Sequence, residues 1–201
     1  MVNVTVVGAA GYTGIEAVRL VLGHPRMKLA AVTSTVDAGK AVSAVYPAFW
    51  DVTELEFCLP DAAEIARVST LALLAVPHTA ALALAPQLLD AGVTVVDMSA
   101  DFRLKDPAVY ESWYGVAHTS PELLDESVFG LPELNRTALP GARLVACPGC
   151  YPTATTLAAF PALAAGVVSS SRVVVDAKSG VSGAGRSASP VLRDWCAAWE
   201  S

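Results

Sequence analysis

Apolar runs rich in β-branched residues alternate along the chain with Ala- and Leu-rich runs of helical spacing. The first run, Val2 to Val7, has no polar alternation, which is typical of a strand covered on both faces. A helix is predicted next, over residues 12–23, with Ile15, Val18 and Leu22 on one face. Further strands are predicted at residues 29–34, 71–76, 93–97, 144–146 and 172–177, and further helices at residues 79–91 and 153–165.

Repeated strand–helix order predicts an α/β fold of the Rossmann type, with a doubly wound and mostly parallel sheet. Residues 99–140 differ, because they are rich in Pro, acidic and aromatic residues and lack a long periodic run. We expect functional loops with short helices there. We expect residues 1–147 to form an NADP-binding Rossmann domain and residues 148–201 to begin an α+β catalytic domain.

The composition narrows the classes of partner. The formal charge of −6 disfavours nucleic acid and anionic membrane as partners. Pro, His, Asp or Gly interrupts each long apolar stretch, so no membrane span is expected, and no cationic leader precedes the first strand. A cytoplasmic protein with reduced thiols is therefore predicted. No metal site is predicted, because the single C-x-x-C stretch lacks a second pair of ligands.

A glycine-rich turn with the spacing G-x-x-G-x-x-G follows the first strand and opens the first helix. Glycine at these positions permits a tight turn and lets the backbone approach a pyrophosphate, which the helix N-terminus attracts. The alternative is a tight turn that binds no ligand. The candidate dinucleotide-binding residues are Gly8, Ala10, Gly11, Tyr12, Thr13 and Gly14.

The end of the second predicted strand bears on the choice of nucleotide. Ser34 and Thr35 stand where an NAD-preferring site usually has an acidic residue for the ribose diol, and Asp37 lies beyond the strand end. Small hydroxyls with Lys40 in reach suit a 2′-phosphate, which favours NADP. The alternative is that Ser34 and Thr35 simply begin a loop.

Cys150 lies between a strand-like run and a helix-like run. A thiol at the start of a helix meets the positive end of the helix dipole and unpaired N–H groups, which favour the nucleophilic thiolate. Three interpretations stay open: a nucleophile that forms a thioester, a redox pair with Cys147, or thiols that only pack. The glycine turn favours the first over the second.

Two polar stretches also follow predicted strands, where ligands of α/β proteins gather. Arg103 could bind a carboxylate or phosphate, or could form a salt bridge with Asp101 or Asp106. His78 could line the cofactor cleft or could merely begin a helix. The Ser- and Gly-rich residues 178–186 offer backbone N–H groups to a cofactor or an oxyanion.

Six stretches, taken together, resemble the N-acetyl-γ-glutamyl-phosphate reductases, a family of arginine biosynthesis related to aspartate-semialdehyde dehydrogenase. They are residues 8–14 (GAAGYTG), 76–78 (VPH), 97–104 (DMSADFRL), 129–136 (FGLPELNR), 148–153 (PGCYPT) and 178–186 (KSGVSGAGR).

The resemblance implies a cytoplasmic NADP-dependent enzyme that reduces N-acetyl-glutamyl 5-phosphate to the 5-semialdehyde, releases inorganic phosphate and forms homo-oligomers when full length. Cys150 matches the family's nucleophile, which forms a thioester that hydride reduces. Ser182 and Gly183 match the loop near the nicotinamide. Arg103 and Lys178 are the candidate substrate-binding residues.

The chain also departs from the family pattern. No histidine follows His118, and the chain ends before the family's His-Arg-His motif, so the acid/base histidine and most of the substrate domain are expected to be missing. Residues 190–201 do not resemble the family's continuation, which suggests truncation or a frameshift near residue 189 and a severe loss of turnover. The alternatives are a non-catalytic dinucleotide-binding remnant, or a reductase of N-acetyl-aminoadipyl or aspartyl phosphate.

Overall fold

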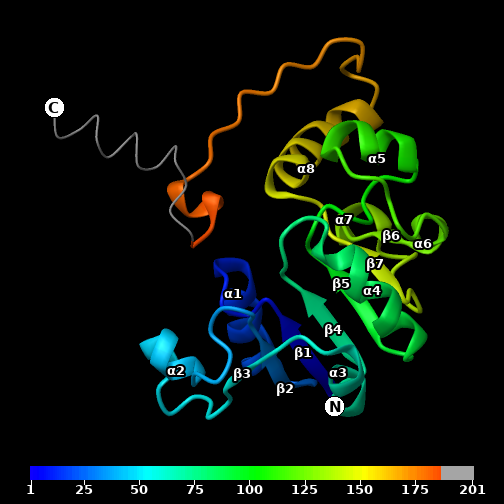
Figure 1. Cartoon of the computed structure of the whole chain (residues 1–201). Helices are drawn as coiled ribbons and strands as arrows, with labels where there is room; N and C mark the ends of the chain where they lie inside the picture. Colours follow the sequence, from blue (N-terminus) through cyan, green and yellow to red (C-terminus); the bar gives the residue numbers. More distant parts are fainter. Residues whose placement is uncertain (187–201) are drawn as a thin grey trace, which may run out of the picture.

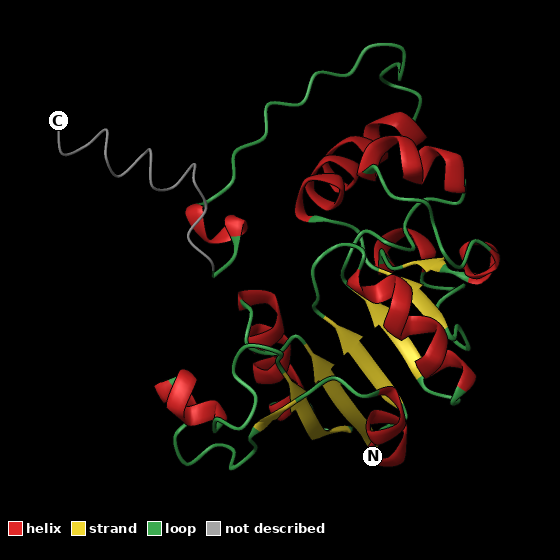
Figure 2. Cartoon of the chain, in the orientation of Figure 1, coloured by secondary structure: helices red, strands yellow, loops and turns green. Residues whose placement is uncertain are grey.

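The computed structural model describes residues 1–186 and contains a sheet of seven parallel strands (Figure 2). The strands lie in the order β3-β2-β1-β4-β5-β7-β6. From β1 the chain moves outward to β3 and then crosses back to β4, so the strand order reverses between β1 and β4. Ligands of doubly wound folds bind at such a reversal. The strands are β1 Val2–Val7, β2 Met27–Thr33, β3 Phe57–Cys58, β4 Leu71–Leu74, β5 Thr94–Asp97, β6 Val128–Phe129 and β7 Leu144–Ala146.

Helices cover both faces of the sheet, and each face has its own buried cluster. One cluster packs α1, α2 and η1 against β1, β2 and β3. The other packs α3, α4, α5 and α6 against β4, β5 and β7. The predicted doubly wound α/β fold is therefore confirmed. The helices named here are α1 Tyr12–Leu22, α2 Val42–Val45, η1 Pro47–Phe49, α3 Ala62–Val68, α4 Ala80–Asp90, α5 Pro107–Tyr114 and α6 Glu122–Glu126.

Strand β1 shows why its sequence carries no polar alternation. Val4 and Val6 belong to the cluster under α1, whereas Val7 belongs to the cluster under α4. All three side chains are at most 1% exposed. A strand in the middle of a parallel sheet must be apolar on both faces, as the sequence predicts.

The helix that carries Cys150 begins earlier than its sequence pattern predicts. Helix α8 spans Cys150–Ala164, so Cys150 is its first residue and Gly149 is the N-cap. Pro152 lies in the first turn, where backbone N–H groups have no partner within the helix and a missing N–H costs little. Cys150 therefore lies at the positive end of the helix dipole.

The strand predicted at residues 172–177 is absent, which corrects the sequence analysis. These residues have no regular secondary structure, and Val173, Val174 and Val175 are 53%, 88% and 52% exposed. A β-rich sequence becomes a strand only beside a partner, and no strand within residues 1–186 pairs with this segment. Figure 1 shows residues 166–180 as an open loop that leads from α8 back toward α1.

Residues 99–140 contain short helices and loops, as predicted, with the short strand β6 in addition. Helices α5, α6 and α7, the last at Pro132–Asn135, all lie in this part of the chain. None of the helices that the structure describes combines the length and apolar character needed to cross a bilayer.

Candidate functional site

The glycine turn joins β1 to α1 in a conformation that two glycines require. Gly8 has a φ of 76°, and a Cβ atom there would lie 2.3 Å from the carbonyl oxygen of Ala75. A Cβ atom at Gly14 would lie 2.2 Å from the carbonyl oxygen of Gly8. Gly11 caps α1, and its N–H donates to the Gly8 carbonyl at 3.1 Å. The turn therefore presents the unpaired N–H groups of the first turn of α1, which suit an anion.

A cavity of about 510 Å³ opens beside this turn at the reversal of strand order. Gly8, Ser34 and Thr35 lie in its wall, so the structure brings together the glycine turn and the two predicted hydroxyl residues. The remaining wall is mainly apolar and comes from the ends of β1, β2 and β4 and from α3 and α4. A cavity of this size can hold one end of a dinucleotide. Its other lining residues are Val7, Thr33, Pro60, Asp61, Ala62, Val76, Pro77, Ala80, Ala83, Leu84 and Gln87.

His78 has a local structural role. Its Nδ1 accepts the N–H of Ala100 at 3.1 Å, and its ring packs near that of Tyr114 with the ring centroids 5.6 Å apart. The neighbouring Val76 and Pro77 line the cavity, but His78 does not. The structure therefore supports the second interpretation of His78, in which it begins a helix and does not line the cofactor cleft.

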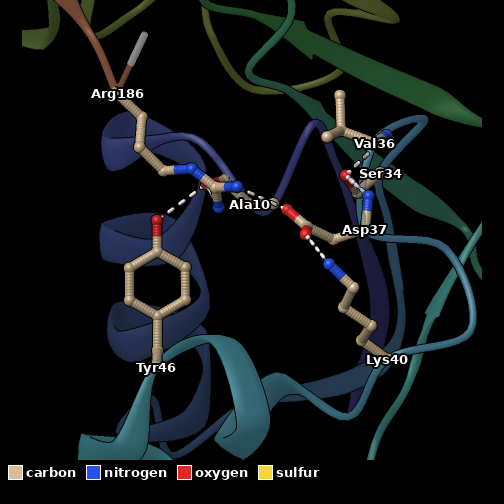
Figure 3. A network of polar contacts seen from close by, with 7 residues as sticks. All are labelled: Ala10, Ser34, Val36, Asp37, Lys40, Tyr46 and Arg186. Atoms are coloured by element: carbon tan, nitrogen blue, oxygen red, sulfur yellow. Dashed lines mark hydrogen bonds and ion pairs between the residues drawn. The ribbon is translucent and has the colours of Figure 1, made fainter. Parts of the chain in front are cut away.

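A polar network, here named the Asp37 rim, surrounds Asp37 in the loop after β2, whose residues Ser34 and Thr35 line the cavity (Figure 3). The Ser34 Oγ accepts the N–H groups of Val36 and Asp37, so this hydroxyl is engaged within its own loop. Asp37 Oδ1 accepts from Lys40 Nζ at 2.8 Å, and Oδ2 accepts from Arg186 Nη2 at 2.7 Å. These two cations, Lys40 first, hold the pKa of the Asp37 carboxyl below its usual range.

This network was missed by the sequence analysis in two respects. Lys40 was expected to be free for a 2′-phosphate, whereas it is paired with Asp37. Arg186, which follows Asp37 by 149 residues, has no sequence signal that links it to the first domain. One carboxylate and two cations still leave a net charge of +1 at this rim.

The two cysteines of the C-x-x-C stretch lie in different environments. Cys150 is exposed at the start of α8, whereas Cys147 is partly buried after β7. Burial, and then the nearby Asp97 carboxylate, raises the pKa of the Cys147 thiol to about 11. Cys58, Cys147 and Cys150 all carry free thiols. Of the pair, Cys150 is therefore the thiol that a substrate can reach.

Arg103 lies against the loop before Cys150. Its Nε donates to the Cys147 carbonyl at 2.6 Å, and its Nη2 donates to the Met98 carbonyl at 2.8 Å. A Cβ atom on Gly149 would lie 3.2 Å from Nη1, so the guanidinium borders the N-cap of α8.

The alternative of a salt bridge from Arg103 to a neighbouring acid is wrong. Asp101 instead accepts hydrogen bonds from the Thr79 and Ala81 N–H groups and from Tyr110. Asp106 accepts the Ala108 N–H and caps α5.

Asp97 and Asp101 are buried carboxylates with structural roles that the sequence analysis did not assign. Asp97, at the end of β5, is fully buried and accepts the Ser99 N–H and hydroxyl at 2.9 and 2.8 Å. Burial raises the pKa of Asp97 to about 6, although the Ser99 hydrogen bonds oppose the shift. Both carboxylates lie in the quoted stretch at residues 97–104, but burial cannot be read from that stretch.

The candidates at the C-terminal side lie on an exposed segment. Lys178 pairs with Asp176 at 2.6 Å, and both side chains are 81% exposed, so among the described contacts Lys178 is not joined to Cys150. Ser182 and Gly183 lie in the short helix η2 (Val181–Ala184). Arg186 then connects this segment to the glycine turn.

Two family models match successive parts of the chain. The model described as semialdehyde dehydrogenase, NAD binding domain, matches residues 3–142. The model described as semialdehyde dehydrogenase, dimerisation domain, matches residues 150–196.

Two named relatives are similar to this chain over 94% and 100% of its length. An N-acetyl-gamma-glutamyl-phosphate reductase of Halorhodospira halophila is 52% identical over 94% of this chain and 54% of its own length. A protein of the same name from Pseudomonas aeruginosa is 48% identical over 100% of this chain and 58% of its own length. The chain thus spans little more than half the length of these relatives. The alignment with the Halorhodospira halophila relative spans 188 residues, whereas the alignment with the Pseudomonas aeruginosa relative spans the whole chain. The dimerisation-domain model extends to residue 196, so some of these matches continue past residue 189. Residues 190–201 lie outside the described structure.

A solved structure supports the fold. The aspartate semialdehyde dehydrogenase II of Vibrio cholerae, solved with ASA, has a TM-score of 0.59 at 18% identity, over 82% of this chain and 43% of that chain. At this identity the likeness concerns the fold alone. From the match over residues 3–142, the chain belongs to the semialdehyde dehydrogenase family and carries its NAD binding domain.

Proposed function

We propose that this chain is the nucleotide-binding part, with the start of the catalytic domain, of an NADP-dependent reductase of N-acetyl-glutamyl 5-phosphate. Residues 1–147 are assigned to the first domain and residues 148–201 to the second. The proposal depends above all on Cys150, an exposed thiol at the first position of α8 with the Arg103 guanidinium beside its N-cap. The names of relatives that are 46–52% identical supply the substrate.

The residues of the glycine turn fit a dinucleotide. A Cβ atom at Gly8 or Gly14 would collide with backbone, so the turn can be this tight only with glycine. Gly8, Ala10, Gly11, Tyr12, Thr13 and Gly14 are assigned to the pyrophosphate, and Ser34 and Thr35 to the adenosine ribose. NADP is favoured over NAD because the rim around Asp37 carries two cations and one carboxylate. When bound, the nucleotide supplies the hydride.

The protein side of the reaction begins with the Cys150 thiolate. It attacks the acyl-phosphate carbonyl, the C–O bond to phosphate breaks, and a thioester and inorganic phosphate form. The helix dipole of α8 stabilises the thiolate and the developing oxyanion. Arg103 is assigned to the substrate's phosphate, because its guanidinium borders Gly149 and an Arg fork binds phosphate bidentately. Lys178, Ser182 and Gly183 are assigned to the substrate and the nicotinamide end.

Thioester formation tests the chemistry without the nucleotide. The chain is exposed briefly to N-acetyl-glutamyl 5-phosphate in the absence of nucleotide, and the reaction is quenched in acid. The chain is then digested, and the masses of its peptides are measured by mass spectrometry. An N-acetyl-glutamyl adduct that lacks phosphate is expected on Cys150. Cys150→Ser should lose the adduct, whereas Cys147→Ser, the matched control, should keep it. An adduct that forms equally in Cys150→Ser would overturn the assignment.

A non-catalytic nucleotide-binding protein is the second candidate. The glycine turn and the cavity lie within residues 1–147, so their fit to a nucleotide does not depend on Cys150. Phosphate-dependent reduction of NADP with N-acetyl-glutamate 5-semialdehyde separates the two candidates. Rates with the aminoadipyl and aspartyl analogues then define the acyl chain length.

The location and assembly are also proposals. A cytoplasmic enzyme with a small-molecule substrate agrees with the charge of −6. Helix α8 has no buried residue, and Tyr151 and Phe160 are each 46% exposed. An apolar helix with so little cover is typical of a surface that packs against other protein, which supports a homo-oligomer.

A further inference from the structure

Arg186 attaches the exposed segment 166–186 to the glycine turn and to the loop after β2. Its Nη1 donates to the Ala10 carbonyl at 2.9 Å, and its Nη2 donates to Asp37 Oδ2 at 2.7 Å (Figure 3). Within the described residues, the hydrogen bonds that join residues 166–186 to residues 1–147 all come from the Arg186 side chain. The position of the whole segment against the glycine turn therefore depends on one guanidinium.

The Asp37 acceptor of this contact is also held by groups of its own loop. The Asp37 side chain is only 4% exposed, and its backbone N–H is held by Ser34 Oγ at 3.0 Å. Lys40 occupies the other carboxylate oxygen, and the pKa of Asp37 is lowered, so the carboxylate stays ionised at neutral pH. A buried, ionised and already oriented carboxylate forms a stronger pair than two flexible surface side chains.

The second acceptor belongs to the glycine turn itself. The Ala10 carbonyl accepts both the Tyr46 hydroxyl at 2.7 Å and Arg186 Nη1. Two acceptors on two different loops match the planar fork of an arginine, whereas a lysine ammonium is a single point of charge. The contact thus joins three places, namely the β1–α1 turn, the loop after β2 and the end of η2.

Residues 179–186, at the end of the attached segment, form a compact turn that is closed by its own hydrogen bonds. Gly183 N–H donates to the Gly180 carbonyl at 3.0 Å, and Gly185 N–H donates to that of Ser182 at 3.0 Å. A Cβ atom at Gly183 would lie 2.3 Å from Ser179 Oγ, so the turn packs closely on itself. Its side chains are otherwise exposed, and the turn lacks an apolar anchor of its own.

We propose that Arg186 is a positioning residue that fastens this turn to the nucleotide site, with Asp37 as its fixed counter-ion. The attachment forms between protein groups and needs no nucleotide. Its consequence rests on the proposed function, which assigns Ser182 and Gly183 to the nicotinamide end of the nucleotide. Loss of the pair releases the turn and weakens binding of the nicotinamide half of NADP(H) more than binding of the adenosine half.

Limited proteolysis tests the attachment without nucleotide. Trypsin cleaves after Arg186 only when its side chain leaves Asp37, whereas Arg172 and Lys178 lie in the exposed loop and provide internal reference sites. In Asp37→Asn, cleavage after residue 186 relative to residue 172 should accelerate roughly three- to tenfold. Arg186→Lys keeps a trypsin site but loses the fork, and it should be cleaved faster for the same reason. Glu126→Gln, which removes the exposed ion pair with Arg143, is the control and should leave the ratio unchanged.

Calorimetric titration with two nucleotides tests the positioning role of Arg186. In Arg186→Met, the ratio of the Kd for NADPH to the Kd for 2′,5′-ADP should rise roughly three- to tenfold, because loss of a cation near the 2′-phosphate affects both ligands and cancels in this ratio. Equal weakening of both ligands would mean that Arg186 binds the adenosine end directly, and this would overturn the positioning role. An unchanged cleavage ratio in both Asp37→Asn and Arg186→Lys would overturn the attachment. If the unaltered chain binds neither ligand, the proposed function fails, and the cleavage ratios alone decide whether the attachment exists.

Discussion

Asp101 accepts a hydrogen bond from the backbone N–H of Thr79, and this bond holds a left-handed residue at the start of α4. Thr79 has a φ of 72°, and its nitrogen lies 2.8 Å from Asp101 Oδ1. The Ala81 N–H donates to Oδ2 at 3.1 Å, and the Tyr110 hydroxyl donates to Oδ1 at 2.9 Å. A β-branched residue in this region costs about 1–2 kcal/mol, which three donors on one buried carboxylate offset.

Replacing Asp101 with alanine should lower the free energy of unfolding by about 2–4 kcal/mol. The variant leaves the Ala81 N–H and the Tyr110 hydroxyl buried without an acceptor and no longer offsets the strain at Thr79. Asp106→Ala is the matched control, because Asp106 caps α5 through one exposed hydrogen bond and should cost about 1 kcal/mol. Urea denaturation compares the two. An equal loss of unfolding free energy in the two variants would show that Asp101 does not stabilise the left-handed conformation of Thr79.

Two glycines of the turn should respond differently to alanine. A Cβ atom at Gly14 would lie 2.2 Å from the Gly8 carbonyl oxygen, whereas one at Gly11 would lie 3.5 Å from the same atom. Gly14→Ala should therefore destabilise the fold by about 2 kcal/mol or more, since helix α1 must move away from β1. Gly11→Ala should fold normally yet bind NADPH roughly tenfold more weakly, because the methyl group occupies the approach of the pyrophosphate. Thermal unfolding and calorimetric titration measure the two effects, and similar thermal stability of both variants would contradict the packing argument.

Much of this fold can be predicted from the sequence, because buried apolar positions recur with the period of a helix or a strand. Strand β1 and helices α1 and α4 are found within a residue or two of their predicted positions, since their apolar spacing is regular. Strands β3 and β6 have two residues each, which is too short for any period to appear. The strand predicted at residues 172–177 fails for a different reason, because pairing depends on a neighbour that local sequence does not specify.

The candidate site was predictable where one short stretch carries the chemistry. The glycine turn and Cys150 lie at strand–helix junctions, so their place follows from local pattern. The pairing of Arg186 with Asp37 joins residues 149 positions apart, and no local pattern encodes such a contact. The partners of Arg103 are carbonyl groups of Met98 and Cys147, which every residue possesses and which composition cannot reveal.

Asp97 should make the protein less stable as the pH rises from about 4 to about 6. Burial raises the pKa of Asp97 to about 6, above the value of about 3.9 in an unfolded chain. The folded state therefore binds the proton more tightly, so the stabilisation is complete below pH 4 and is lost as the pH passes through 6. The loss is of the order of 3 kcal/mol. Asp97→Asn should flatten this part of the stability profile relative to the unaltered chain, as measured by urea denaturation at several pH values. Parallel profiles would show that Asp97 does not titrate in this window.

Iodoacetamide should distinguish the two thiols of the C-x-x-C stretch. With a pKa of about 11, Cys147 is thiolate in only about one molecule in a thousand at pH 8, and it is partly buried. Cys150 is exposed at the start of α8 and should be alkylated at least roughly tenfold faster, as peptide mass spectrometry under limiting reagent can measure.

The same labelling also tests the cause of the Cys147 shift. The Asp97 carboxylate is one of the groups that raise this pKa, so Asp97→Asn should increase labelling of Cys147 at pH 8. Cys58 lies on β3, away from this carboxylate in the sheet order, and provides the internal reference whose labelling should not change. Unchanged labelling of Cys147 in this variant would leave burial alone as the cause. Labelling of Cys147 as fast as that of Cys150 in the unaltered chain would contradict the distinction between the two thiols, and with it the choice of Cys150 as the nucleophile.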